Sequence, residues 1–185
     1  METDPSTWPS TGWLDPRVVV GRSPIEGRGL FAAEPIAAGA VLMRLGGDVL
    51  TDDQFGAVRR ATYSALAVGE GMHLLLPDDS PTTFGNHSCD SSLWLDDALT
   101  LTTRRPLGAG DEVTVDYALF TVDAGWSMPC RCGAEVCRGI VTGDDWRRPG
   151  VQARYAGHFS PFLNRRIALL RQEHGRWDGP GGAPH

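Results

Sequence analysis

The chain contains no lysine: all 17 of its basic residues are arginine. It is also poor in cysteine, with four in 185 residues. No apolar run approaches the length of about 20 residues that a membrane-spanning helix needs, and the N-terminus lacks the basic and then apolar order of a secretory signal. We therefore expect no membrane association and a cytoplasmic location, where thiols stay reduced. The absence of lysine, with abundant alanine, glycine and aspartate, favours a bacterial source with a GC-rich genome.

Negative charge predominates, since 23 acidic residues face 17 arginines. It is unevenly spread: residues 1–143 hold 10 arginines against 19 acids, and residues 144–185 hold 7 against 4. The larger, acidic part would repel a phosphate backbone, which disfavours direct nucleic-acid binding. An acidic body suits a basic partner such as a lysine-rich peptide, although a merely solvated acidic surface explains the charge equally well.

Short apolar stretches separated by glycine and proline predict a mainly β fold in one domain. A capping box at Thr51 and Gln54 predicts a short helix to about Arg60. Ser160 and Pro161 have the residue types of an N-cap and a first helical residue, which predicts a second helix. The predicted strands cover residues 17–20, 30–33, 41–45, 72–76, 93–95, 98–103 and 113–117.

The four cysteines indicate one metal site. Cys130, Cys132 and Cys137 form a C-x-C-x4-C motif, and Cys89 closes a polar run that also contains His87. Zinc prefers four thiolates or imidazoles in a tetrahedron, and a closed four-cysteine shell is structural because no position is left for substrate. The alternative is a set of buried free thiols. His87 is a candidate ligand, but four thiols already fill the shell, so we expect a packed, hydrogen-bonded imidazole.

Three other features have ordinary interpretations when each is taken singly. Gly27-Arg28-Gly29 lies between two predicted strands, where Gly-x-Gly is most often a turn, although it also permits close backbone approach to a cofactor. Asn86 alone is typical of a turn. Tyr117, at the end of an alternating strand, is by itself typical of a core.

Taken in order, these features resemble a known family. GRGLFA (27–32), NHSC (86–89), GDEVTVDY (110–117) and CRCGAEVCRG (130–139) look like a bacterial-type SET-domain protein lysine methyltransferase with its post-SET zinc motif. The resemblance covers roughly residues 17–142. It implies a mainly β, SET-domain (β-clip) fold of several short sheets, with a knot-like C-terminal crossing, short helices and a small zinc-bound lobe.

The resemblance also divides the chain into four parts. Residues 1–16, which carry three prolines, are expected to be a flexible N-terminal arm. Residues 17–122 would be the SET domain and residues 123–142 the post-SET zinc lobe. Residues 143–185 would be a C-terminal extension with one helix and, from residue 175, a disordered tail.

The activity that the resemblance implies is S-adenosylmethionine-dependent methyl transfer to the ε-amine of lysine in a protein substrate. Tyr117 would be the catalytic residue, beside the transferring methyl group and the incoming amine. The implied cofactor-binding residues are Gly27, Arg28, Gly29, Asn86, His87 and Tyr117. The implied zinc ligands are Cys89, Cys130, Cys132 and Cys137.

The sequence departs from the family at the lysine channel. Met72 and His73 stand where an aromatic residue commonly lines it, and Val115 replaces a ring linked to the number of methyl groups added. Tyr63 and Tyr155 are candidates for the missing ring. The thinned channel leaves open an alternative, a cofactor- and zinc-binding SET scaffold with little or no transfer activity. A zinc module that binds nucleic acid is a third hypothesis, which the acidic body disfavours.

Overall fold

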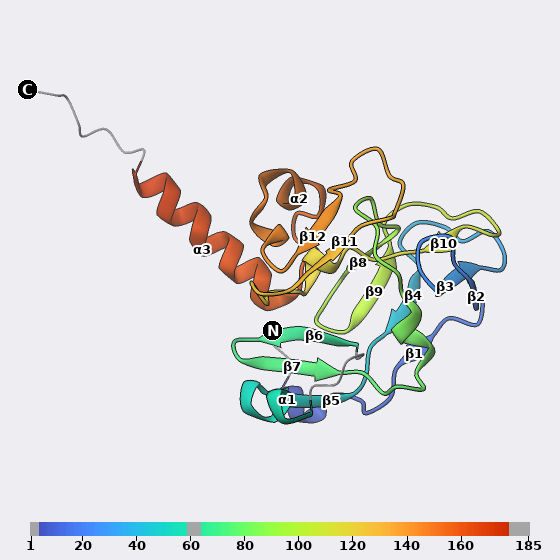
Figure 1. Cartoon of the computed structure of the whole chain (residues 1–185), viewed down its shortest axis with the longest axis horizontal. Helices are drawn as coiled ribbons and strands as arrows, with labels where there is room; N and C mark the ends of the chain where they lie inside the picture. The colour runs from blue at the N-terminus through green and yellow to red at the C-terminus, as the bar shows by residue number, and fades with distance from the viewer. Residues whose placement is uncertain (1–3, 59–63, 178–185) are drawn as a thin grey trace, which may run out of the picture.

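The computed structural model describes residues 4–58 and 64–177. Short antiparallel strands dominate these residues (Figure 1), which confirms the prediction of a mainly β fold. The strands are β1 (Trp13–Leu14), β2 (Val18–Arg22), β3 (Arg28–Ala32), β4 (Val41–Arg44), β5 (Asp48–Thr51), β6 (Ala65–Gly69), β7 (Met72–Leu75), β8 (Leu93–Leu95), β9 (Thr100–Thr103), β10 (Glu112–Val113), β11 (Ser127–Pro129) and β12 (Ile140–Thr142). The α-helices are α1 (Asp52–Val58), α2 (Pro149–Arg154) and α3 (Pro161–Trp177), and the 3₁₀ helices are η1 (Pro5–Thr7), η2 (Pro81–Phe84), η3 (Tyr117–Leu119) and η4 (Asp145–Arg147).

The strands form four small sheets, with the orders β1-β4-β9-β8, β10-β3-β2, β5-β7-β6 and β11-β12. One hydrophobic core connects the first three of these sheets. Leu30 of β3, Leu42 of β4 and Leu74 of β7 are fully buried and belong to the same cluster as Phe162 of α3. The C-terminal extension therefore shares the core of the sheets.

Part of the segment predicted as a flexible arm pairs with the body, from Pro9 to Leu14. Trp13 and Leu14 form β1, in which Trp13 pairs with Arg44 of β4. The Gly47 N–H donates to the Pro9 carbonyl over 2.9 Å. Pro9, which precedes β1, favours extended backbone, the conformation that an added edge strand requires.

The predicted strand over residues 113–117 is shorter than expected. Only Glu112 and Val113 form β10, and Val115 makes single parallel bridges. The reason is Asp116, whose carboxylate accepts the Ala118 N–H over 3.0 Å and caps η3 at Tyr117. A side-chain cap of this kind favours a helical turn over continued strand.

Both predicted helices are present. The capping box is confirmed, because the Thr51 N–H donates to Gln54 Oε1 over 2.9 Å and the Gln54 N–H to Thr51 Oγ1 over 3.3 Å. The predicted end near Arg60 lies outside the described residues. The described part of the extension, residues 143–177, has two α-helices instead of one, since α2 precedes α3.

Helix α3 begins at Pro161, as predicted, and projects away from the sheets (Figure 1). It continues to Trp177, past the predicted start of a disordered tail at Gly175; residues 178–185 of that tail lie outside the described residues. None of the helices in the described parts of the chain has the length and apolar character of a membrane span.

Candidate active site and metal centre

The NHSC run and the residues before Tyr117 lie side by side. The Val115 N–H donates to the Asn86 carbonyl over 3.0 Å, and the Ser88 N–H donates to the Val115 carbonyl over 3.1 Å. These two bonds form a parallel bridge between His87 and Val115. Since both come from the neighbours of His87, its own main-chain N–H and C=O make no hydrogen bond with the described residues.

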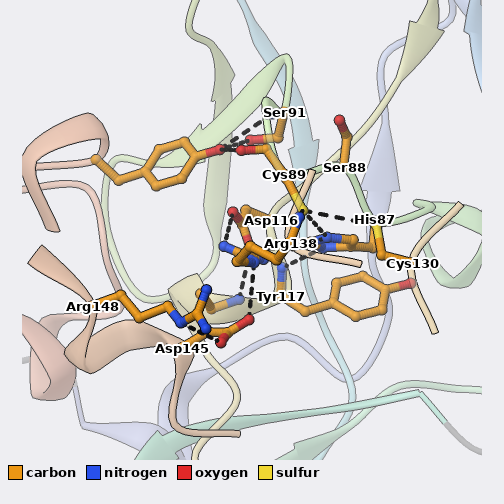
Figure 2. Close-up of polar contacts among 12 residues, drawn as sticks. His87, Ser88, Cys89, Ser91, Asp116, Tyr117, Cys130, Arg138, Asp145 and Arg148 are labelled. Carbon is orange, nitrogen blue, oxygen red and sulfur yellow. Dashed lines mark hydrogen bonds and ion pairs between the residues drawn. The ribbon is translucent and has the colours of Figure 1, made fainter. Parts of the chain in front are cut away.

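Hydrogen bonds hold Tyr117 at its main-chain N–H and at its hydroxyl. Its N–H donates to His87 Nδ1 over 3.2 Å, and its hydroxyl donates to the Gly85 carbonyl over 3.2 Å (Figure 2 shows the Tyr117 and His87 side chains). The two rings are 5.2 Å apart between centroids. Burial raises the pKa of Tyr117 to about 12, so the hydroxyl stays protonated at any physiological pH.

Two aromatic residues that the sequence analysis did not single out surround Tyr117. The ring centroid of Phe120 is 5.9 Å from that of Tyr117, and the centroid of Trp126 is 6.2 Å away. Phe120 is the C-cap of η3, three residues after Tyr117, and this short spacing could have indicated the contact. Trp126 lies beyond the motif, and nothing in the local sequence marks it.

Tyr155, one of the two candidates for the missing channel ring, is engaged elsewhere. Tyr155 is fully buried, and its hydroxyl donates to the Cys89 carbonyl over 3.3 Å and accepts the Ser91 N–H over 3.2 Å. It therefore supports the turn after Cys89. Tyr63 lies outside the described residues. His73 stacks on Phe55, with centroids 4.4 Å apart.

The Asn86 side chain connects the glycine-rich loop to Glu112 of strand β10. Its Nδ2 is 3.1 Å from the carbonyls of Glu26 and Arg28 and 2.9 Å from Glu112 Oε1. Three acceptors around one atom identify it as the nitrogen of the amide. Among the described residues, none donates a hydrogen bond to Asn86 Oδ1, so this oxygen can accept one. Glu112 Oε1 also accepts the Ser23 hydroxyl over 2.8 Å, whereas its Oε2 is buried and has no hydrogen bond with the residues that the structure describes.

The two glycines of the loop meet different surroundings. Gly27 has a positive φ of 48°, and a Cβ added there would meet nothing within 4 Å. A Cβ added at Gly29 would lie 2.3 Å from Glu112 Oε1. Arg28 turns its guanidinium onto the ring of Phe84, 3.8 Å from the centroid. The loop is thus closely packed at Gly29 and open at Gly27.

All four cysteines come together. The sulfurs of Cys89, Cys130, Cys132 and Cys137 lie within 4.8 Å of one another, and the four are free thiols. The Cys89 and Cys130 sulfurs are 3.7 Å apart, close to the edge of about 3.8 Å in a tetrahedron with Zn–S bonds of about 2.3 Å. The donor set and spacing therefore fit zinc.

Backbone amides stabilise negative charge on these sulfurs. The Arg138 N–H donates to Cys89 Sγ over 3.3 Å, and the Gly139 N–H donates to Cys137 Sγ over 3.4 Å. Without a cation, burial raises the pKa of the Cys89 thiol to about 11, although the amide and the charge of Arg138 oppose it. Such outer-shell donors are typical of sulfur sites that hold a metal.

His87 lies between the cysteine cluster and Tyr117. Because its Nδ1 accepts the Tyr117 N–H, the neutral ring carries its proton on Nε2, which is 3.3 Å from Cys89 Sγ. Burial lowers the pKa of His87 to about 4; Asp116 opposes this shift and Arg138 adds to it. The imidazole is therefore neutral at physiological pH and acts as a packed hydrogen-bonding link.

Comparison with known proteins agrees with this geometry. The SET domain family model matches residues 27–118. Histone-lysine N-methyltransferase ash1 of Drosophila melanogaster is 29% identical over 149 residues, which are 71% of this chain and 7% of ash1. Methyltransferase flvH of Aspergillus flavus is 31% identical over 99 residues, or 52% of this chain and 54% of flvH. The chain thus spans about half of flvH and a small part of ash1.

A solved structure shows the same fold. The methyltransferase domain of human histone-lysine N-methyltransferase SETMAR superposes with a TM-score of 0.55 and 22% identity, covering 68% of this chain and 58% of that one. The family match includes Asn86, His87 and Tyr117 and ends before Cys130. Residues 27–118 of this chain are a SET domain, related in sequence to histone-lysine N-methyltransferases.

Proposed function

We propose that the chain transfers a methyl group from S-adenosylmethionine to the ε-amine of lysine in a protein substrate, with one structural zinc. The observation that carries the proposal is the convergence of the glycine loop, the NHSC run and Tyr117 at one crossing. These groups come from three separate stretches of the chain, and each was implied by the resemblance. Tyr117 is the proposed catalytic residue.

The residues at the crossing fit the cofactor. Gly27 faces open space, so the backbone of Gly27, Arg28 and Gly29 is accessible to a ligand. Asn86 directs its amide nitrogen into the loop, which leaves the amide oxygen to accept from an ammonium group. The main-chain N–H and C=O of His87 are available as one donor and one acceptor. The proposed cofactor site therefore offers polar groups of both kinds beside an open surface.

Bound S-adenosylmethionine supplies a methyl group already activated by its sulfonium charge. The task left to the protein is alignment of the incoming amine, which is worth several kcal/mol in well-oriented reactions. Tyr117, held by His87 and Gly85, is placed to orient the amine through its hydroxyl oxygen. Its raised pKa makes it an orienting group and no general base.

The substrate lysine must lose its proton before it can attack, although its free pKa is about 10.4. Apolar walls favour the neutral amine, because burial disfavours the charged form. Phe120 and Trp126, beside Tyr117, are the side chains proposed to line this channel. They supply aromatic surface that Met72 and Val115 lack.

Zinc would join the SET domain to the lobe that follows it. Cys89 belongs to the NHSC run, and Cys130, Cys132 and Cys137 belong to the lobe, so a shared cation cross-links the two. The proposed post-SET lobe holds its thiols in a closed shell, which gives zinc a structural role and no reactive one.

The proposed partner is a basic, lysine-containing protein or peptide. The acidic body, with 19 acids against 10 arginines over residues 1–143, attracts such a substrate and repels nucleic acid. Because the chain has no lysine, methylation of its own side-chain ε-amines is excluded. A cytoplasmic location remains part of the proposal.

Calorimetric titration with S-adenosylmethionine tests the cofactor site. Asn86→Ala should weaken binding by about tenfold or more, since a hydrogen bond to a charged group contributes about 1.5–3 kcal/mol. Asn164→Ala is the matched control, because its amide bonds two backbone carbonyls of the extension, those of Gly157 and Phe159. Unchanged affinity in Asn86→Ala would remove this residue from the site. Tight binding without any methyl transfer would favour the alternative, an inactive binding scaffold.

A further inference from the structure

Three charged side chains are buried together next to Tyr117 (Figure 2). The side chains of Asp116 and Asp145 are 0% and 2% exposed, and that of Arg138 is 5% exposed. Charges this deeply buried are rare unless they are paired. Asp116 precedes Tyr117 directly, Arg138 follows the cysteine motif, and Asp145 belongs to η4 in the extension. The cluster therefore joins three parts of the chain.

Arg138 connects the two carboxylates. Its guanidinium donates to Asp116 through two parallel bonds, Nη1 to Oδ2 over 2.9 Å and Nη2 to Oδ1 over 2.6 Å. Its Nε is 2.9 Å from Asp145 Oδ2, but the N–H is not directed at that oxygen, so this contact is an ion pair. Burial alone would lower the pKa of Arg138, and the carboxylates outweigh it and raise the pKa instead.

Asp145 is itself held in place. Its carboxylate accepts the Thr142 N–H over 3.3 Å and the Thr142 hydroxyl over 3.2 Å. Nε of the exposed Arg148 lies 3.3 Å from Asp145 Oδ1. The extension thus presents a fixed negative charge to Arg138, in a region that the SET family match does not reach.

Asp116 contacts both Arg138 and the turn that begins at Tyr117. The same Oδ1 that accepts from Arg138 caps η3 by accepting the Ala118 N–H over 3.0 Å. The first residue of η3 is Tyr117. A shift of the Asp116 carboxylate therefore moves the turn that orients the Tyr117 ring.

We propose that Asp145 is a positioning residue for Tyr117, acting through Arg138 and Asp116, so that the C-terminal extension sets the geometry of the active site. The consequence for methyl transfer rests on the proposed function. The consequence for the position of Tyr117 does not, and it can be measured without substrate.

Tyrosine NMR gives the direct test. The chain has three tyrosines, so protein labelled with ¹³C in tyrosine rings gives few signals, and the Tyr117 signal is the one lost in Tyr117→Phe. Asp145→Asn should shift or broaden this signal. Asp144→Asn is the matched control: it makes the same change at the neighbouring residue, whose ion pair with Arg147 is about half exposed on both sides. An unmoved Tyr117 signal in folded Asp145→Asn would overturn the proposal.

Kinetics with mixed core histones as methyl acceptor distinguish positioning from simple support of the fold. Asp145→Asn should lower kcat by about tenfold or more, since small displacements from a reactive geometry are costly. The KM for histones, the zinc content and the affinity for S-adenosylmethionine should stay at wild-type values. A wild-type kcat, or a parallel loss of zinc and cofactor affinity, would overturn the positioning role. An inactive wild-type protein would contradict the proposed function and leave the NMR result to decide this proposal.

If Asp145→Asn does not fold, Arg138→Lys tests the positioning role instead. Lysine keeps the buried positive charge, but it lacks the planar fork that reaches two carboxylates at once. In folded, zinc-loaded Arg138→Lys we expect the same displaced Tyr117 signal. An unmoved signal would overturn the proposal.

Discussion

Alanine in place of Gly29 is predicted to break the network that holds the glycine loop. The added Cβ would lie 2.3 Å from Glu112 Oε1 and 3.1 Å from Asn86 Nδ2. The Glu112 carboxylate would have to move by about 1 Å to restore normal contact distance. That movement breaks its hydrogen bonds with Ser23, 2.8 Å, and Asn86, 2.9 Å.

The size of the effect follows from those two bonds. Hydrogen bonds to a charged group contribute about 1.5–3 kcal/mol each, and partial relaxation reduces their sum, so we expect a loss of about 3 kcal/mol. For a chain of this length, the melting temperature should fall by about 6–12 °C. The freed Asn86 amide could then rotate, and cofactor binding should weaken as well.

Gly27→Ala is the matched control for Gly29→Ala. Its Cβ meets nothing within 4 Å, and only the positive φ of 48° is unfavourable, at about 1 kcal/mol. Calorimetry of unfolding should therefore show a fall of about 2–4 °C, while the new methyl group protrudes into the proposed cofactor site and weakens binding. Equal melting temperatures for the two variants would refute the reasoning about Glu112.

Two further predictions concern the metal and the pH dependence. Protein purified without chelator should contain one zinc per chain. Cys132→Ser should lose both the metal and the activity, because three thiols leave the shell open. Metal analysis that finds no stoichiometric zinc in the wild type would contradict this prediction. The kcat/KM of transfer should rise by about tenfold per pH unit from pH 7 to 9, since it follows the free substrate, whose amine has a pKa of about 10.4 and must be neutral. Tyr117 adds no titration in this range, because burial raises its pKa to about 12; a rate that is level from pH 7 upward would be the contrary result.

The sequence predicts the parts of the fold that depend on local patterns. The hairpin of β8 and β9 is present, with Leu93 opposite Thr103, and the helix after Thr51 starts at its capping box. Strands β5 and β6 were missed because both are defined by pairing with β7. The shortened β10 reflects one side-chain cap, that of Asp116, which competes with the alternating pattern.

The candidate site likewise has parts that the sequence predicts and parts that only the tertiary fold brings together. The cysteine count predicted a cluster that does form, because a chain with only four thiols and one C-x-C-x4-C motif offers few alternatives. Phe120, Trp126 and Asp145 were not anticipated. Phe120 lies three residues after Tyr117 and had a local signal. Trp126 and Asp145 are brought to Tyr117 and Arg138 by the tertiary fold, and no local spacing encodes those two contacts.

Methyl transfer itself is the most direct test of the proposed function. Purified protein would be incubated with S-adenosylmethionine carrying a labelled methyl group and a lysate of the source organism, beside Tyr117→Phe. The account predicts label on lysine in discrete protein bands, lost in Tyr117→Phe while that variant keeps its zinc and its affinity for the cofactor. Absence of label from wild-type protein that holds zinc and binds the cofactor would contradict it.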